Sequence, residues 1–347
     1  ALGDARKPGG AVVRAPPAPL ADEGGDPPVV ELRRLPVPEP GPGEVLVRVQ
    51  ACGVCHTDLD QVEGRIAPPR LPVVPGHQAV GRVAALGAGV AEHRPGDRVG
   101  VGWIHASTGE ADENLSPAFR ATGRDTDGGY AEYLAVGERY AHPIPDAYAD
   151  AEAAPLLCAG AVGYRALALT GLRDGEPLGL AGFGGSAHLV LQIARHRYPS
   201  SPVSVSARRP RAREAALALG AAWAGAIEDA PPRPPQAIID TTPAWRPVIA
   251  ALGALQPGGR LVINAIRKED RDRGALGELR YHEHLWMERE VKSVANVSGR
   301  DIREFLALAP DVPIRPAVAT YPLEQAVGAL ADLRRGDVTG SKVLLIG

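Results

Sequence analysis

Apolar and polar positions alternate over short stretches in the first part of the chain. The segments 44–50 (EVLVRVQ) and 81–86 (GRVAAL) show this alternation, which is typical of half-buried strands. The residues 94–98 (RPGDR) form a turn signal that leads into a short strand over 99–101. Short strands with turn residues at close intervals predict an irregular, β-rich first domain.

The pattern changes after Cys158, where apolar runs of strand length alternate with helical periodicity. We expect helices over 160–170, 187–195, 211–219 and 245–255, and strands over 178–181, 203–206, 237–240 and 260–263. This alternation predicts an α/β domain with a parallel, doubly wound sheet. After Asn296 the chain is expected to return to the first domain and to end in a strand over 342–346. The predicted domains are therefore 1–158 with 298–347, and 159–297.

The composition is that of an ordinary globular protein. The 347 residues are 45% hydrophobic and 23% charged, and the formal net charge is -3. This balance gives no electrostatic footprint for nucleic acid. We see no apolar run of transmembrane length and no secretory signal. Three cysteines are too few for a disulfide framework, so a cytoplasmic protein is expected.

Cys55, His77 and Cys158 are candidate metal ligands. Two thiolates and an imidazole are ligand types that zinc prefers, and three protein ligands leave a fourth position open, as catalytic zinc requires. Each residue alone also has a plainer explanation, because a buried cysteine can be a small hydrophobe and a lone histidine a core residue. Their joint order, followed directly by a nucleotide-binding signature, favours the metal.

The segment 182–187 (GFGGSA) fits the pattern G-x-G-x-x-A between a predicted strand and a predicted helix. Its glycines allow a tight turn and close approach of the backbone to a pyrophosphate, which then faces the helix N-terminus. The candidate cofactor-binding residues here are Gly182, Gly184, Gly185, Ser186 and Ala187.

The residues after the second predicted strand bear on the choice of cofactor. NAD enzymes usually place an acidic residue there for the ribose hydroxyls, but the chain has none between Ala187 and Arg213. It has Arg208 and Arg209 instead, and an arginine can pair with a 2′-phosphate. The alternative is a solvated basic loop. We expect NADP(H) to be preferred over NAD(H).

From about residue 31 to the C-terminus, the chain closely resembles the medium-chain, zinc-dependent alcohol dehydrogenases. The phrases that carry the resemblance occur in order: CGVCHTDL, PGHQAVGRV, GDRVGVGW, DGGYAEY, PLLCAG and GFGGSAHL. The resemblance implies a GroES-like catalytic domain, interrupted by a Rossmann domain, with the active site in the cleft between them. It also implies a homodimer or homotetramer.

Carried over to this chain, the resemblance implies that Cys55, His77 and Cys158 hold one catalytic zinc. Thr57 would bind the substrate hydroxyl and begin proton transfer. Asp58 would orient His77, and His56 would lie near the cofactor pyrophosphate. Cys52 matches a position that is not a ligand, so we expect it to pack in the core. Trp103 would line the substrate pocket or belong to the core.

The chain also departs from the family at several positions. Many relatives carry a second, structural zinc held by four cysteines, but residues 104–125 contain no cysteine, so we expect this zinc to be absent. Gln78 replaces the usual Glu and removes a negative charge near the metal. Asp60 stands where several relatives use a histidine to finish the proton relay, and it is either a proton acceptor or a surface residue.

The sequence therefore predicts a reversible NADP(H)-dependent oxidoreductase that interconverts alcohols with aldehydes or ketones. The main alternative is a zinc-independent quinone or enone reductase with the same fold, which would lack the three ligands. A non-catalytic NADP-binding protein is the second alternative, and an intact Thr57 beside an intact ligand set disfavours it.

Overall fold

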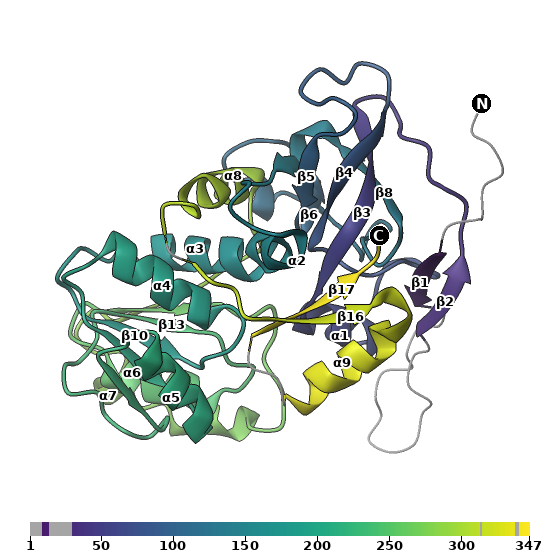
Figure 1. The fold of residues 1–347 in the computed structure, drawn as a ribbon. Helices are drawn as coiled ribbons and strands as arrows, with labels where there is room; N and C mark the ends of the chain where they lie inside the picture. Colours follow the sequence, from purple (N-terminus) through teal and green to yellow (C-terminus); the bar gives the residue numbers. More distant parts are fainter. Residues whose placement is uncertain (1–8, 14–29, 313, 337–339) are drawn as a thin grey trace. The chain divides into compact units, whose positions relative to one another are not determined.

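The computed structural model describes residues 9–13, 30–312, 314–336 and 340–347 (Figure 1). They divide into two compact units. The first comprises the described residues through Cys158, Val297–Ala307 and Arg315–Gly347, and the second comprises Ala159–Asn296 and Leu308–Ile314. Unlike the predicted division, this one places Val297 in the first unit and Leu308–Ile314 in the second.

The first unit is built on a mostly antiparallel sheet. Within the described residues this sheet has seven strands in the order β16-β17-β3-β4-β5-β9, with β8 paired to β3. Its strands are β3 (Glu44–Val54), β4 (Ala79–Leu86), β5 (Arg98–Val101), β8 (Tyr133–Gly137), β9 (Ala141–Pro143), β16 (Val318–Pro322) and β17 (Ser341–Leu345). The β-rich expectation for this part of the chain is confirmed.

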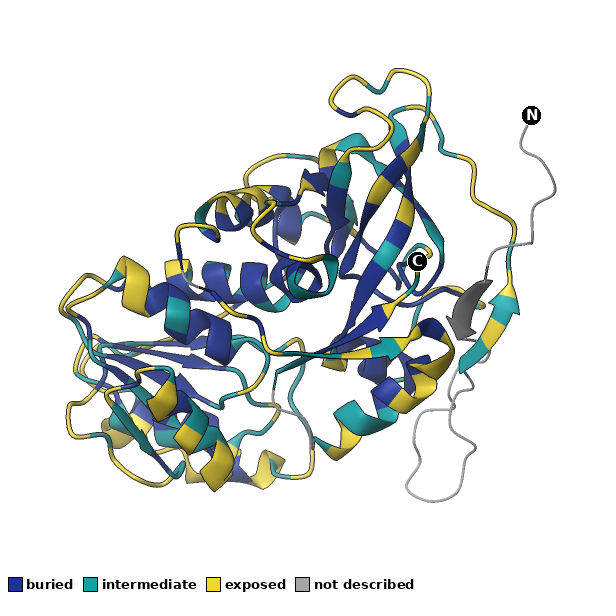
Figure 2. Cartoon of the chain, in the orientation of Figure 1, coloured by how far each residue is buried: buried dark blue, intermediate teal, exposed yellow. Residues whose placement is uncertain are grey.

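β3 is the central strand of this sheet and leads directly to the candidate metal site. It pairs with β17, β4 and β8, and two register shifts interrupt its ladder with β4. Such irregularities bend a strand and increase its twist. β4 begins with three buried residues, and buried and exposed residues then alternate along it, as the coloured bands in Figure 2 show.

Shorter elements complete the first unit. They are β1 (Gly9–Val13) paired with β2 (Val30–Arg34), β6 (Ile104–Ala106) paired with β7 (Arg120–Ala121), the helices α1 (His56–Val62), α2 (Asp150–Ala153), α8 (Gly299–Leu308) and α9 (Ala326–Arg335), and the 3-10 turns η1 (Glu113–Leu115), η2 (Glu138–Tyr140), η3 (Ala154–Leu157) and η5 (Leu323–Gln325).

The second unit is a doubly wound parallel sheet, as predicted. Its described strands follow the order β12-β11-β10-β13-β14-β15, and every pair is parallel. The strands are β10 (Leu178–Ala181), β11 (Val203–Ser206), β12 (Trp223–Gly225), β13 (Ala237–Asp240), β14 (Arg260–Ile263) and β15 (Glu290–Ser293). The helical elements are α3 (Ala159–Thr170), α4 (Ala187–Arg197), α5 (Pro210–Ala218), α6 (Arg246–Ala254), η4 (Arg273–Glu278) and α7 (Tyr281–His284).

The order of these strands reverses between β10 and β13. From β10 the chain proceeds to β11 and β12, whereas from β13 it proceeds the other way to β14 and β15. Ligands of doubly wound sheets bind outside the carboxyl ends of the strands at such a switch point. The carboxyl ends of β10 and β13 are Ala181 and Asp240, which are register partners.

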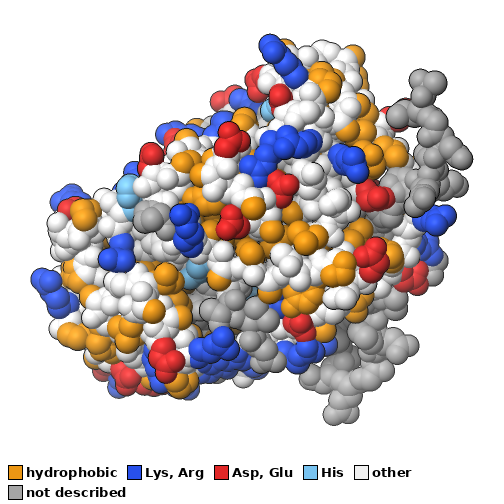
Figure 3. All heavy atoms as spheres, in the orientation of Figure 1, with side chains coloured by type: hydrophobic (Ala, Val, Ile, Leu, Met, Phe, Trp, Pro, Cys, Tyr) orange, Lys and Arg blue, Asp and Glu red, His pale blue; other side chains and the backbone are white. Residues whose placement is uncertain are grey.

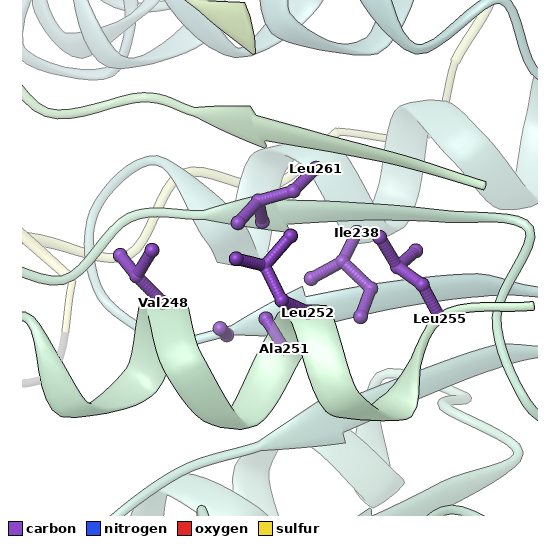
Figure 4. Close-up of a cluster of buried hydrophobic side chains, with 7 residues drawn as sticks. Ile238, Val248, Ala251, Leu252, Leu255 and Leu261 are labelled. Atoms are coloured by element: carbon purple, nitrogen blue, oxygen red, sulfur yellow. The ribbon is translucent and has the colours of Figure 1, made fainter. Parts of the chain in front are cut away.

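The core of the second unit forms where α6 packs on β13 and β14. Figure 4 shows side chains from the helix and both strands in one cluster, which consists of Ala181, Ile238, Val248, Ala251, Leu252, Leu255 and Leu261. All are at most 6% exposed. β10 and β13 are buried at all four positions, as expected of parallel strands covered on both faces.

Two whole-chain properties agree with the composition. Acidic and basic side chains are interspersed over the face in Figure 3, without a large area of one sign. Among the described residues, one helical stretch, Asp150–Thr170, is long and apolar enough to cross a membrane, and 67% of its most apolar window is buried inside the fold. Core helices of globular proteins share these properties, so the stretch supports no membrane assignment.

Candidate functional site

The end of β3 and the start of α1 place Cys55. It is the N-cap of α1, and its Sγ accepts a hydrogen bond from Thr57 N at 3.4 Å. Asp58, at the third helical position, accepts from Cys55 N at 2.9 Å through Oδ2. These two bonds form a capping box, which satisfies donors at the helix start and holds the thiol in place.

His77 lies between Gly76 and β4, and Asp58 orients its ring. Nδ1 is 2.9 Å from Asp58 Oδ1, and both side chains are buried. Nε2 faces the other way and lies 3.3 Å from Cys158 Sγ. A carboxylate on one ring nitrogen is the usual device for fixing the other as a metal ligand.

Cys158 follows η3 and immediately precedes α3. One ligand atom each from Cys55, His77 and Cys158 lie within 4.8 Å of one another. Bonds of about 2.3 Å to sulfur and about 2.0 Å to nitrogen bring tetrahedral zinc ligands within about 4 Å of each other. The three predicted ligands therefore converge, and their donor set and spacing fit a zinc ion.

The surroundings of Cys55 favour its thiolate form. A hydrogen bond from Cys158 is the main cause that lowers the pKa of Cys55, and the nearby His77 adds to it, against the opposing effect of burial. Burial would lower the pKa of His77, but Asp58 and Cys55 outweigh it and raise this pKa to about 10. The thiolate is the form of cysteine that binds metal.

Tyr130 is a site residue that sequence reasoning missed. Its hydroxyl donates to Asp58 Oδ2 at 3.2 Å, and its side chain is fully buried. The ring also lies against Gly76, which has a φ of 96°; a Cβ there would come within 2.3 Å of Tyr130 Cδ1. Only glycine fits this position, so Tyr130 contacts both the residue before His77 and the carboxylate that orients it.

Trp103 and Cys52, two further residues that the resemblance brings into question, are both buried. Trp103 is 7% exposed and packs edge-on against the His77 ring, with the centroids 4.8 Å apart. Cys52 is fully buried, and burial is the main cause that raises its pKa, as expected of a packing residue.

Asp60 was expected to be either a proton acceptor or a surface residue, and it does not lie on the surface. It is 7% exposed, because α1 turns it inward, and Arg65 Nε donates to its Oδ1 at 2.5 Å. Its other expected role, as a proton acceptor, stays a prediction. Thr57 is buried at 9% exposure, whereas His56 is exposed at the first position of α1.

The glycine-rich loop lies in the second unit, between β10 and α4. Gly182 has a φ of 87°, and a Cβ there would come within 2.8 Å of Thr241 Oγ1. Ser186 Oγ donates to Ala159 O at 2.8 Å. His188, which sequence reasoning did not assign, lies within hydrogen-bonding distance of Gly184 O through Nδ1, at 3.1 Å. The loop is thus held in a defined conformation at the carboxyl edge of the sheet.

The remaining predicted cofactor residues follow β11. Arg208 and Arg209 are exposed, and Arg209 is the N-cap of α5. Gly184 has open space where a Cβ would stand. Gly182, Gly184, Gly185, Ser186 and Ala187 all precede or open α4, which begins at Ala187.

The segment 104–127 is organised by a carboxylate. Glu113 is 3% exposed, and its Oε2 accepts from Gly109 N at 3.0 Å and from Tyr140 Oη at 2.8 Å. Its Oε1 accepts from Gly299 N, the first residue of α8, at 2.7 Å. Within the described chain, Cys55, His77 and Cys158 are the sole group of three metal-ligating side chains at this spacing.

The combination of a doubly wound nucleotide-type unit and a β-rich unit with a Cys-His-Cys donor set is that of the two-domain dehydrogenases. The sequence model of the alcohol dehydrogenase GroES-like domain matches residues 41–146. The chain is 44% identical over 321 residues to a probable alcohol dehydrogenase AdhA of Mycobacterium tuberculosis, covering 89% of this chain and 91% of that protein. An alcohol dehydrogenase of Geobacillus stearothermophilus is 32% identical, with 91% and 95% covered.

A similar solved structure is that of an NAD-dependent alcohol dehydrogenase. It superposes with a TM-score of 0.83 at 25% identity, and 98% of this chain and 100% of that chain are covered. The chain belongs to the medium-chain, zinc-type alcohol dehydrogenase family.

Proposed function

We propose that this protein is a zinc-dependent alcohol dehydrogenase or carbonyl reductase that transfers hydride between NADP(H) and an alcohol, aldehyde or ketone. The observation that carries the proposal is the convergence of Cys55, His77 and Cys158, with His77 held by Asp58. The relatives named as alcohol dehydrogenases support the same reaction class.

When bound, zinc supplies a Lewis acid for the substrate oxygen, and the nicotinamide supplies or accepts the hydride. Cys55, His77 and Cys158 would hold one such zinc, and they are the one group of three such side chains among the described residues. Asp58 keeps the His77 ring in place through Nδ1, so that Nε2 remains available to the metal.

Thr57 would move the proton. Its side chain lies two residues beyond Cys55, at the start of α1, where its Oγ1 is proposed to receive the hydroxyl proton of the alcohol and to pass on its own. From Thr57 the proton would pass on to solvent, with the ribose of a bound cofactor as the expected direction. Asp60, whose Oδ1 accepts a hydrogen bond from Arg65 Nε, is the proposed final acceptor.

The choice of cofactor rests on the chain's own residues. The glycine-rich loop would take the pyrophosphate, and His56 would approach it from the start of α1. Arg208 and Arg209 are proposed to pair with the 2′-phosphate of NADP(H). The similar structure named as NAD-dependent makes NAD(H) the alternative to test.

The described surface also supports the expectation of a homodimer or homotetramer. All four residues of the edge strand β15 are exposed, and exposed edge strands readily pair with another chain. Tyr281 and Trp286, which precede this strand in the sequence, are at least half exposed, and their rings contact each other. Large exposed aromatic side chains are typical of interfaces.

The proposed ligands are small molecules. A cytoplasmic location remains a prediction.

Steady-state kinetics with a panel of alcohols and aldehydes test the proposal. We expect turnover with a lower KM for NADPH than for NADH, loss of activity after complete zinc removal, and recovery on zinc addition. Activity that survives complete zinc removal would indicate the zinc-independent reductase instead. A lower KM for NADH would refute the cofactor preference alone.

A further inference from the structure

A buried ion pair lies at the switch point of the second unit, outside the residues considered so far. Asp240 is the last residue of β13 and is fully buried, and its carboxylate pairs with the ammonium of Lys268, whose side chain is 7% exposed. Burying two charges is costly unless their remaining hydrogen-bonding groups are also satisfied.

Both members of this pair are fully satisfied. Lys268 Nζ also donates to Thr242 O at 2.7 Å and to Ala244 O at 3.1 Å, so its three donors have acceptors. The second oxygen of Asp240 accepts from Thr242 N at 3.0 Å and from Thr242 Oγ1 at 2.7 Å. Lys268 is therefore not available as a direct ligand for a phosphate.

The pair joins the loop after β13 to the loop after β14. Backbone bonds from Asn264 N to Asp240 O and from Glu269 N to Pro243 O, both 2.7 Å, run beside it. The residues 241–244 and 264–268 are thus held together at the carboxyl edge of the sheet, where dinucleotides bind in this class of fold.

The same assembly also supports the glycine-rich loop. Thr241 N donates to Ala181 O at 2.9 Å, and a Cβ at Gly182 would come within 2.8 Å of the Thr241 side chain and 2.9 Å of the Thr242 side chain. On the other side, Asn264 Nδ2 donates to Ser186 Oγ at 3.5 Å. A displacement of either loop would therefore disturb the turn that is proposed to bind the pyrophosphate.

We propose that Asp240 and Lys268 are positioning residues for the dinucleotide: their ion pair holds the loops 241–244 and 264–268 in the conformation that accepts the cofactor. The inference rests on the proposed function. Pre-organised loops bind more tightly because less ordering is required on binding. Without the pair, the chain would still fold but would bind the cofactor more weakly.

The test is the double variant Asp240→Asn/Lys268→Met, compared with the wild type by NADPH fluorescence titration. The variant leaves no unpaired buried charge, so its unfolding temperature should stay within a few degrees of the wild type. We expect the Kd for NADPH to rise at least tenfold. The KM for NADPH should rise by the same factor, with kcat at saturation unchanged, whereas a merely structural role would lower kcat through loss of folded enzyme.

The pair Arg260–Glu290 provides the matched control. It joins the first residues of β14 and β15, at the opposite edge of the same sheet, with a distance of 2.7 Å. Arg260→Met/Glu290→Gln should leave the Kd for NADPH unchanged. If the Asp240→Asn/Lys268→Met variant does not fold, Lys268→Arg retains the charge but cannot direct three donors to the same acceptors, and its Kd should rise at least threefold.

The outcomes separate the inference from the proposed function. A folded Asp240→Asn/Lys268→Met variant, or a Lys268→Arg variant in its place, with a Kd for NADPH within twofold of the wild type would overturn the inference alone. A wild type that binds neither NADPH nor NADH would overturn the proposed function and the inference with it. If the wild type prefers NADH, the same comparison is made with NADH.

Discussion

Asp58 is the residue on which the geometry of the candidate zinc site depends. One oxygen holds His77 Nδ1, and the other accepts from Cys55 N and from Tyr130 Oη. Two of the three proposed zinc ligands are thus positioned by a single buried carboxylate. Tyr130 is the side chain that positions the carboxylate in turn.

Tyr130→Phe should weaken zinc binding about tenfold, because outer hydrogen-bond partners of metal ligands typically contribute factors of this size. The substitution removes only the hydroxyl, so the packing against Gly76 remains. Competition with a chromophoric chelator measures the affinity. Tyr140→Phe is the control, since its hydroxyl binds Glu113 and not the metal site. Equal zinc affinity in Tyr130→Phe and the wild type would show that the hydroxyl does not support Asp58.

His142 makes the stability of the protein dependent on pH. Burial is the main cause that lowers the pKa of His142 to about 3, and Arg303 and His93 add to it. The unfolded chain binds a proton at this residue below about pH 6.5, whereas the folded chain does not until about pH 3. Stability from this group is therefore complete above pH 6.5 and is lost as the pH falls towards 3.

At pH 5 this effect should cost about 2 kcal/mol of unfolding free energy relative to pH 7. Urea denaturation at both pH values measures it. In His142→Gln the free energy of unfolding should differ between pH 5 and pH 7 by about 2 kcal/mol less than in the wild type, whatever the variant's stability at pH 7. A difference as large as in the wild type would show that His142 is not the group responsible.

Among the elements, the segment 104–127 is organised around the buried carboxylate of Glu113. Glu113 connects Gly109, Tyr140 and the first residue of α8 through three hydrogen bonds from a buried position. A carboxylate at a helix N-terminus is also favoured by the helix dipole. Glu113 therefore ties this segment to η2 and to the start of α8.

Glu113→Gln should lower the free energy of unfolding by about 2–3 kcal/mol, because an amide cannot accept all three bonds and places a donor against donors. Zinc content should not change. Glu110→Gln, an exposed position in the same segment, is the control and should change stability by less than about 0.5 kcal/mol. Equal stability of the two variants would show that Glu113 does not hold this segment.

The elements also show which parts of the fold the sequence could predict. The strands 178–181, 203–206, 237–240 and 260–263 were predicted to the residue, because buried strands between helices leave short apolar runs with clear ends. β15 was missed, since its residues are exposed and carry no alternating pattern. β12 was also missed, because three residues are too few to show a period.

The site was predictable only in part for a related reason. The three ligands have distinctive side-chain chemistry, so residue type and order were enough to find them. Tyr130, Lys268 and Glu113 act through contacts with residues 72, 28 and 186 positions away, respectively. No local pattern marks such contacts. The Asp58 capping box is the exception, because a helix N-cap with an acidic residue three positions later is a recognisable local signal.

In the molecule as a whole, the proposed metal site and the proposed cofactor site belong to different units of the chain. The three zinc ligands belong to the first unit, and the glycine-rich loop with Arg208 and Arg209 belongs to the second. Cys55→Ser should therefore abolish turnover but leave the Kd for NADPH within about threefold of the wild type. Fluorescence titration measures this Kd. A parallel loss of cofactor binding would show that the two sites are not separable.

The most direct test of the central claim is the zinc content of the protein, purified without chelator or added metal and measured by elemental analysis. We expect about one zinc per chain for the wild type, as for a single catalytic site, although Gln78 stands beside the ligand histidine. We expect a value near zero for Cys55→Ser. A wild-type value near zero, with no gain in activity when zinc is restored, would contradict the central claim.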